Sequence, residues 1–295
     1  MGNLNQNRSA EIPKYLNLGC GRRFHQDWVN VDFESSNQSV RACNLLEGIP
    51  FKEGEFDAVY HSHVLEHFSK PDGKTFLCEC YRVLKTGGVL RVAVPDLEQI
   101  VRHYLKCLDG ALLGDADSAL NYEWIMLEMY DQTVRNQSGG EMGKYFCRDK
   151  MDNEEFVYAR LGQEAKLIRD SFLKTKGASA NSGHPMDRKS LLRQVFNPKR
   201  CWLMIRKIVF YKSMKELARS QGYAEIGRFR LGGEVHQWMY DRYSLGKLMK
   251  ECGFSDMRVT TAFESRIAEW NRYELESKDG IVHKPDSLFM EARKA

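Results

Sequence analysis

Short apolar runs alternate with polar stretches through the first hundred residues. Residues 15–18, 28–31, 56–60 and 89–94 are brief runs of apolar side chains, which is typical of buried strands. Residues 73–84 instead place their apolar side chains three and four positions apart, as an amphipathic helix does. Strands that alternate with helices predict an α/β fold, in which the strands pair in parallel and helices cover both faces of the sheet.

The pattern changes in the middle of the chain and returns near its end. Residues 97–230 are rich in long polar side chains and indicate helices joined by loops. Residues 243–252 predict a helix that ends at Gly253, since glycine suits the left-handed position after a helix. Residues 257–262 and 287–292 then predict two closing strands. The sequence therefore predicts an α/β core interrupted by a mainly helical insertion.

Composition excludes several classes of function. The 295 residues carry a formal net charge of +4, too small an excess to favour nucleic acid as a partner. None of the eight cysteines forms a CxxC pair, so we expect no metal site. The chain also shows no apolar leader and no apolar run long enough to span a membrane. Together with reduced thiols, these features predict a cytoplasmic protein.

A glycine-rich turn follows the first predicted strand. It contains Asn17, Gly19, Cys20 and Gly21, and its glycines would let the backbone approach a ligand closely. Asp32 ends the second strand, where a carboxylate can accept hydrogen bonds from both hydroxyls of a ribose. Alternatively, the glycines could form only a tight turn between a strand and a helix, and Asp32 could be an ordinary surface residue. Because the two features lie at the ends of adjacent strands, together they favour a ligand site.

Two further motifs strengthen this interpretation. Residues 56–67 have the sequence FDAVYHSHVLEH, and residues 82–90 have the sequence RVLKTGGVL. The order of glycine turn, acidic strand end and these two motifs resembles the class I S-adenosylmethionine-dependent methyltransferases. The resemblance covers about residues 14–98 and resumes at about 230–292.

The resemblance implies a Rossmann-like methyltransferase core with an insertion. We accordingly divide the chain into an N-terminal part of the core at 1–97 and a C-terminal part at 231–295. Between them, residues 98–230 form the mainly helical insertion. We expect this insertion to bind the acceptor, to act as a lid or to lie near a membrane.

S-adenosylmethionine is the methyl donor that the resemblance implies. The implied donor-binding residues are Asn17, Gly19, Cys20, Gly21, Asp32, Asn44, Leu45, His61 and Ser62. The glycine turn would line the methionine end of the donor, and Asp32 would hold its ribose hydroxyls. Asn44 stands where the family has an aspartate facing the adenine amine, and its amide oxygen can still accept a hydrogen bond.

The connection between the first two strands is short. Only ten residues separate Gly21 from Asp32, whereas a complete dinucleotide-binding unit has a helix there and about 20 residues. We therefore expect the first helix to be very short or absent. This expectation disfavours a nicotinamide-dependent oxidoreductase, because a pyrophosphate needs the N-terminus of that helix.

A closer resemblance is to a bacterial subgroup associated with surface-polysaccharide biosynthesis. Its motifs WxNxD, SHVLEH, VPDLE and GExHxWMYDRYSL occur here at 28–32, 62–67, 94–98 and 233–245. This resemblance implies O-methylation of a sugar that is nucleotide-linked or part of a growing glycan. Methylation of another small metabolite at O, N or C stays open, as does a donor-binding protein without catalysis.

Three side chains are candidates for a general base, which a weakly acidic alcohol acceptor would need. His63 and Asp96 follow the fourth and fifth strands, and His236 lies where the chain returns to the core. Each has an alternative role: the histidines could hold loops or pack in the interior, and Asp96 could cap a helix.

Residues 193–213 combine several lysines and arginines with large apolar side chains and contain no acid. Such a stretch forms either a basic amphipathic helix at a membrane surface or an insertion helix that packs on the core. A peripheral location at the inner membrane face is therefore an additional prediction, and the oligomeric state stays open.

Overall fold

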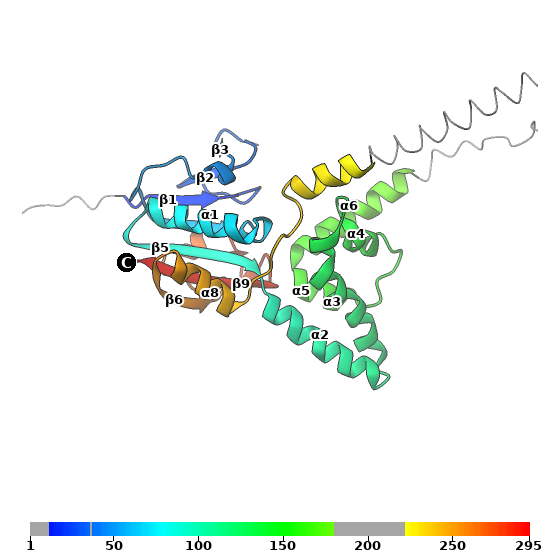
Figure 1. Cartoon of the computed structure of the whole chain (residues 1–295). Helices are drawn as coiled ribbons and strands as arrows, with labels where there is room; N and C mark the ends of the chain where they lie inside the picture. Colours follow the sequence, from blue (N-terminus) through cyan, green and yellow to red (C-terminus); the bar gives the residue numbers. More distant parts are fainter. Residues whose placement is uncertain (1–11, 36, 180–221) are drawn as a thin grey trace, which may run out of the picture.

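A seven-stranded sheet forms the core of the computed structural model, which describes residues 12–35, 37–179 and 222–295 (Figure 1). Its strand order is β3-β2-β1-β4-β5-β9-β6. The strands are β1 (Tyr15–Leu18), β2 (Trp28–Asp32), β3 (Val40–Ala42), β4 (Phe56–Ser62), β5 (Leu84–Pro95), β6 (Phe254–Thr260) and β9 (Ser287–Lys294). This arrangement confirms the predicted α/β fold with a Rossmann-like sheet.

Strand direction divides the sheet into two parts. Strands β1 to β5 pair in parallel, whereas β9 lies between β5 and β6 and is antiparallel to both. The two predicted closing strands are confirmed with shifted bounds, and the pairing of β6 with β9 contains a register shift between Ser255 and Arg258. The chain order reverses at β1, which lies between β2 and β4, so a crevice opens there at the carboxyl ends of the strands.

The two faces of the sheet are covered differently. Helices α1 (Lys70–Val83) and α8 (Arg242–Glu251) pack on one face and complete the main hydrophobic core. The other face is covered by the segment 267–275, which buries Trp270 and Tyr273 against Trp28. The expectation of helices on both faces is therefore wrong for this second face. That face is covered instead by the 3₁₀ turn η3 (Trp270–Tyr273), whose large aromatic side chains are buried on the sheet.

The connections explain why one face lacks helices. Between β1 and β2 the described residues form only turns, as the ten-residue spacing predicted. The chain passes from β3 to β4 through the single 3₁₀ turn η1 (Leu45–Glu47). The helix α1 ends at Val83 and continues directly into β5, with Gly87 at a φ of 78° inside that strand. Gly87 thus lies in an irregularity of the strand.

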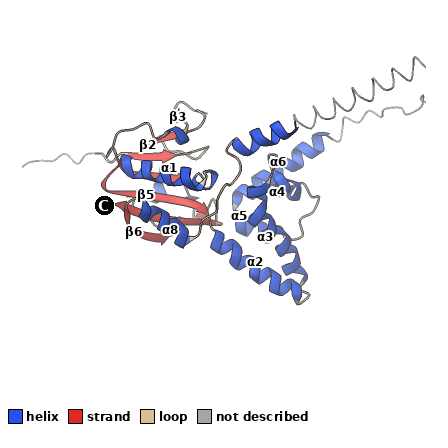
Figure 2. Ribbon diagram, viewed as in Figure 1, coloured by secondary structure: helices blue, strands red, loops and turns tan. Residues whose placement is uncertain are grey.

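Five helices follow β5 and gather beside the carboxyl ends of the strands (Figure 2). They are α2 (Leu97–Leu112), α3 (Ala116–Val134), α4 (Gly140–Phe146), α5 (Glu154–Leu161) and α6 (Gln163–Ser179). A separate apolar cluster around Trp124, Phe146 and Val157 holds α3 to α6 together. No helix among the described residues is long and apolar enough to cross a membrane. The basic stretch 193–213 lies outside the described residues.

Candidate functional site

The glycine turn is shaped by close packing. Gly19 has a φ of 63°, and a Cβ atom there would lie 2.4 Å from Cγ2 of Val64. The side chain of Asn17 is buried beneath the turn, where its Nδ2 donates to the carbonyl of Arg23 and to Oδ1 of Asn30. The turn therefore brings bare backbone to the carboxyl end of β1.

Asp32 holds the same turn from the neighbouring strand. Its Oδ2 accepts a hydrogen bond from the backbone N–H of Gly21 at 2.5 Å, and its Oδ1 accepts from the N–H of Phe33 at 2.6 Å. Each carboxylate oxygen keeps a further lone pair for a ligand. Asp32 thus links the end of β2 to the glycine turn, although it does not itself line the pocket above that turn.

A pocket of about 590 Å³ opens above the glycine turn, between the sheet and helix α6. Its lining combines the turn with the carboxyl end of β4 and with the C-terminal part of the chain. The lining residues are Asn17, Gly19, Cys20, Gly21, Arg22, Arg23, Tyr60, Ser62, His63, Leu167, Ile168, Ser171, Leu275 and Lys284. We call this space the turn pocket. It brings together five of the nine residues that the resemblance implies for the donor.

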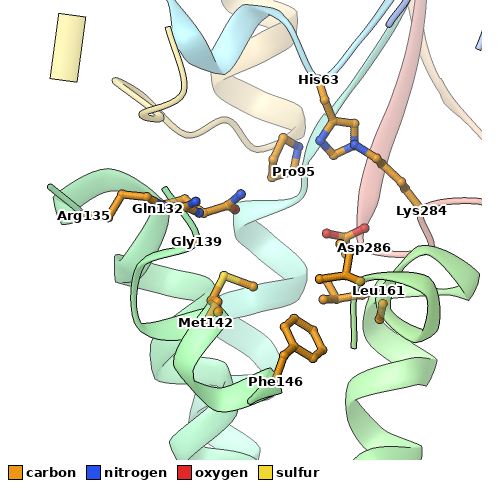
Figure 3. Close-up of a pocket in the computed structure, with 13 residues that line it drawn as sticks. His63, Pro95, Gln132, Arg135, Gly139, Met142, Phe146, Leu161, Lys284 and Asp286 are labelled. Carbon is orange, nitrogen blue, oxygen red and sulfur yellow. The ribbon is translucent and has the colours of Figure 1, made fainter. Parts of the chain in front are cut away.

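A second cavity of about 260 Å³ adjoins the turn pocket on the side of the helices, and we call it the helical cavity. Figure 3 shows His63 and Lys284 on its sheet side, with Met142 and Phe146 opposite on the helical part. His63, Ile168 and Lys284 line both spaces, so the two cavities meet at these three side chains.

His63 lies at this junction in a constrained conformation. Its φ is 53°, a region that side-chain-bearing residues rarely adopt, and such strain is often found at functional sites. Its Nε2 lies 2.8 Å from Oγ of Ser287, and its Nδ1 lies 3.2 Å from Oε1 of the fully buried Glu66. Because a carboxylate only accepts hydrogen bonds, Glu66 favours a proton on Nδ1 and leaves Nε2 as the acceptor.

The other two base candidates do not line either space. Asp96 caps helix α2, and its Oδ1 accepts from the N–H groups of Glu98 and Gln99. Burial raises the pKa of Asp96, whereas those two backbone contacts lower it. His236 is buried against the ring of His67, and burial is the main cause that lowers its pKa to about 3. The capping and packing roles considered for these two residues match their surroundings.

Three of the residues implied for the donor also lie outside the turn pocket. Asn44 caps the 3₁₀ turn η1 with its Oδ1, and Leu45 packs partly buried against the main core. His61 is fully buried and makes an edge-to-face contact with Phe76 of helix α1, so it faces the opposite side of the sheet. Burial lowers the pKa of His61 to about 4, which keeps the ring neutral.

Several lining residues were not predicted from the sequence. Arg22, Arg23 and Tyr60 lie next to residues that were, and the alternation of side chains along β4 would have indicated Tyr60 together with Ser62. Gln132, Lys284 and the other residues of the helical cavity come from segments distant in sequence, and no local pattern indicates them.

Comparison with known proteins agrees with this geometry over the first part of the core. Residues 16–92 match the family model described as a methyltransferase domain. Over these residues the chain is similar to methyltransferase domains. The matched residues extend from β1 into β5, so they contain the glycine turn, Asp32 and the carboxyl end of β4.

Individual relatives match the methyltransferase domain over limited parts of their length. A "Probable S-adenosylmethionine-dependent methyltransferase" of Mycolicibacterium smegmatis is 28% identical over 99 residues, which cover 28% of this chain and 37% of that protein. The matched part therefore spans little more than a third of this relative.

Two solved structures are also similar. One is an S-adenosylmethionine-dependent methyltransferase of Archaeoglobus fulgidus, with 11% identity, a TM-score of 0.36 and coverage of 96% of this chain and 87% of the other. The second is 1,6-didemethyltoxoflavin-N1-methyltransferase of Burkholderia thailandensis, with S-adenosylhomocysteine bound. The identity is 21%, the TM-score is 0.25, and the match covers 28% of this chain and 45% of the other.

Proposed function

We propose that this protein is an S-adenosylmethionine-dependent methyltransferase that transfers the methyl group to a hydroxyl of a sugar. The observation that carries the proposal is the junction of two cavities at His63, with the turn pocket for the donor on one side and the helical cavity for the acceptor on the other. Methyl transfer needs such an alignment, because the nucleophile must approach the methyl carbon in line with the leaving sulfur.

The residues of the turn pocket fit the donor. Gly19 and Gly21 have no side chain of their own that could block a ligand from the backbone, and Asp32 lies at the strand end where a ribose diol would be held. Arg23 and Lys284 supply positive charge for the carboxylate of the methionine end. The donor brings an activated methyl group on a sulfonium, and the protein itself has to bind, orient and exclude water.

The lining of the helical cavity supports a polar ring as acceptor. Gln132, Arg135 and Asp286 offer hydrogen-bonding groups, while Met142 and Phe146 offer an apolar surface. A sugar ring combines the same two properties, since its hydroxyls seek polar groups and its C–H face stacks on aromatic rings. The volume lies just below the usual range of about 300–1,000 Å³ for small-molecule sites, so a single ring suits the space.

His63 is the base in this proposal. Its Nε2 faces Ser287, and an acceptor hydroxyl that took the place of the serine hydroxyl could transfer its proton to that nitrogen. Asp96 and His236 are not kept as bases, because neither lines the helical cavity. General-base catalysis is worth roughly 100- to 10,000-fold, so His63→Gln should lower kcat by at least about 100-fold and leave donor affinity nearly unchanged.

In this proposal the insertion binds the acceptor through its described helices, because α3, α4 and α6 line the helical cavity. The sugar and the link to polysaccharide biosynthesis come from the sequence motifs. A screen of sugars, nucleotide sugars and unrelated hydroxylated or amino metabolites, read by the mass of one added methyl group, would separate these acceptor classes.

Calorimetric titration with S-adenosylmethionine tests the donor first. We expect micromolar binding to the wild type, a loss of about tenfold or more in Asp32→Ala, and no binding of NAD, since hydrogen bonds to charged groups contribute about 1.5–3 kcal/mol. Glu34→Ala is the matched control, because it removes an exposed carboxylate two residues away. Binding of NAD in preference to S-adenosylmethionine would contradict the proposal, and donor binding without turnover of any acceptor would favour a non-catalytic protein.

A further inference from the structure

A group of polar side chains lies beside the site, and it touches the proposed chemistry only through the contact of Glu66 with His63. Glu66 and His67 belong to the 3₁₀ turn η2 (Leu65–His67) that follows β4, and His236 lies on the segment that returns from the helices to the core. One ligand atom from each of the three residues lies within 4.8 Å of the others. The rings of His67 and His236 are nearly perpendicular, at 86°, with centroids 4.8 Å apart.

The carboxylate of Glu66 is fully buried and incompletely paired. Its Oε1 faces Nδ1 of His63 at 3.2 Å, whereas its Oε2 has no hydrogen-bond partner among the described residues. Nδ1 of His67 is buried without a partner as well. A buried carboxylate that lacks hydrogen bonds costs several kcal/mol, so such groups normally pair with a cation or coordinate a metal.

The three side chains carry the chemical groups that a metal ion of this kind binds. Such an ion takes an ionised carboxylate and imidazole rings that each offer one nitrogen lone pair, and Glu66, His67 and His236 bring these groups together.

We infer that Glu66, His67 and His236 bind a divalent transition-metal ion of the Zn²⁺ type. One carboxylate oxygen and two imidazole nitrogens form a ligand set that Zn²⁺ takes in proteins, whereas Mg²⁺ and Ca²⁺ prefer oxygen ligands alone. The expectation of no metal site considered only cysteines and close spacings. His236 is far from His67 in sequence, so only the fold brings the ligands together.

The ion would fasten the returning segment to the loop after β4. The backbone already joins them, because the N–H groups of Gln237 and Trp238 donate to the carbonyl of Glu66. The N–H of His236 in turn donates to the carbonyl of Gln132, whose residue lines the helical cavity. The site therefore connects the wall of the helical cavity with the strand end that carries His63. It does not depend on the proposed methyl transfer.

The test uses the full chain, freed of any histidine tag and stripped of metal with a chelator. Addition of Zn²⁺ should give about one bound equivalent per chain by mass spectrometry of the desalted protein and should raise Tm. Glu66→Gln and His236→Gln should each weaken Zn²⁺ binding by at least about tenfold, since even residues around a metal site typically change affinity 10- to 100-fold. His103→Gln, in which the changed histidine lies on α2 outside the cluster, should bind Zn²⁺ as the wild type does.

Addition of Co²⁺ to the wild type gives a readout that does not depend on whether the variants fold. Ligation by nitrogen and oxygen should give visible d–d absorption without the near-ultraviolet charge-transfer band of a thiolate ligand. The inference is overturned if wild type binds no Zn²⁺ or Co²⁺, if a thiolate band shows cysteine ligation instead, or if folded Glu66→Gln binds as tightly as His103→Gln. None of these outcomes bears on donor binding, so the proposed function is tested separately.

Discussion

Gly19 and Val64 are in direct contact at the carboxyl ends of β1 and β4, and the space between them has no room for a methyl group. A Cβ atom on Gly19 would lie 2.4 Å from Cγ2 of Val64 and about 3.5 Å from two other carbons of the same side chain. Gly21 has a similar positive φ of 54°, but a Cβ atom there would meet nothing within 4 Å. The two glycines of the turn are therefore required for different reasons.

Alanine substitutions should separate these reasons. At Gly21 only the left-handed backbone is penalised, by about 1–2 kcal/mol. Gly19→Ala adds a steric clash that either the turn or Val64 must relieve by moving. We expect Gly19→Ala to weaken S-adenosylmethionine binding at least about tenfold more than Gly21→Ala, as measured by calorimetry. Equal effects of the two substitutions would show that the contact with Val64 does not shape the site.

The same pair of strands shows how far sequence reasoning reaches. Gly19, Ser62 and His63 could be placed at one site because parallel strands end at the same edge of a sheet, and the hydrophobic runs give the strand ends. His61 was grouped with Ser62, although successive side chains of a strand point to opposite faces. It consequently packs on Phe76, away from the turn pocket.

Cavity residues that come from segments distant in sequence could not be predicted. Lys284 and Asp286 reach the helical cavity only because β9 inserts between β5 and β6, and Gln132 does so through the packing of helix α3. Nothing in the local sequence of these segments records such contacts. Likewise, the pattern predicted helices on both faces because it could not show that Trp270 and Tyr273 would cover one of them.

The pH dependence of alkylation at Cys20 provides a probe of the donor site. Burial, with a smaller contribution from Asp32, raises the pKa of its thiol to about 11. Only the thiolate is nucleophilic, so its alkylation by iodoacetamide should be slow at pH 8 and should rise about tenfold per pH unit up to pH 10. For a thiol with an ordinary pKa, the rate of alkylation would level off near pH 9. Mass mapping would follow Cys20, with the exposed Cys78 as internal control.

S-adenosylmethionine should protect Cys20 from this reagent and leave Cys78 unaffected, because Cys20 lines the turn pocket. Rapid labelling of Cys20 at pH 8, or labelling unchanged by saturating donor, would contradict the placement of the donor against the glycine turn.

Gln132 should affect the acceptor and not the donor. Its side chain faces the helical cavity, whereas it does not line the turn pocket (Figure 3). A neutral hydrogen bond contributes about 0.5–1.5 kcal/mol, so Gln132→Ala should raise the acceptor KM by roughly 2- to 10-fold and leave the donor Kd unchanged. Steady-state kinetics and calorimetry on the same preparation would show this. Thr133→Ala is the control, since its hydroxyl bonds only to the carbonyl of Tyr130 in the preceding turn. A change in donor affinity alone would reverse the assignment of the two spaces.

Arg91 should be the main electrostatic support of the sheet. It is fully buried in β5, where it pairs with Glu276 and Glu291 and donates to the carbonyls of Thr261 and Glu264. Removal of one partner of a buried ion pair typically costs about 3–5 kcal/mol, because the remaining charges lose their compensation. Arg91→Met should therefore lower Tm by roughly 10 °C, since about 1 kcal/mol shifts Tm by a few degrees in a protein of this size.

The loss of stability in Arg91→Met should also grow with pH. Burial already raises the pKa of Glu276 to about 7, and Arg91 is the main group that lowers it. A carboxyl whose folded-state pKa is raised contributes stability at low pH that is lost as pH rises through that pKa. Without Arg91 the pKa of Glu276 rises further. The variant therefore continues to lose stability as pH rises above 7, whereas the wild type has already lost this contribution at that pH. The difference in unfolding free energy between variant and wild type should therefore widen from pH 7 to pH 9 in urea titrations.

Arg258→Met, which removes a partly exposed partner of Glu291, is the control and should lower the unfolding free energy by less than about 1 kcal/mol with little pH dependence. A difference for Arg91→Met that stays constant from pH 7 to pH 9 would show that the buried carboxylates find other compensation.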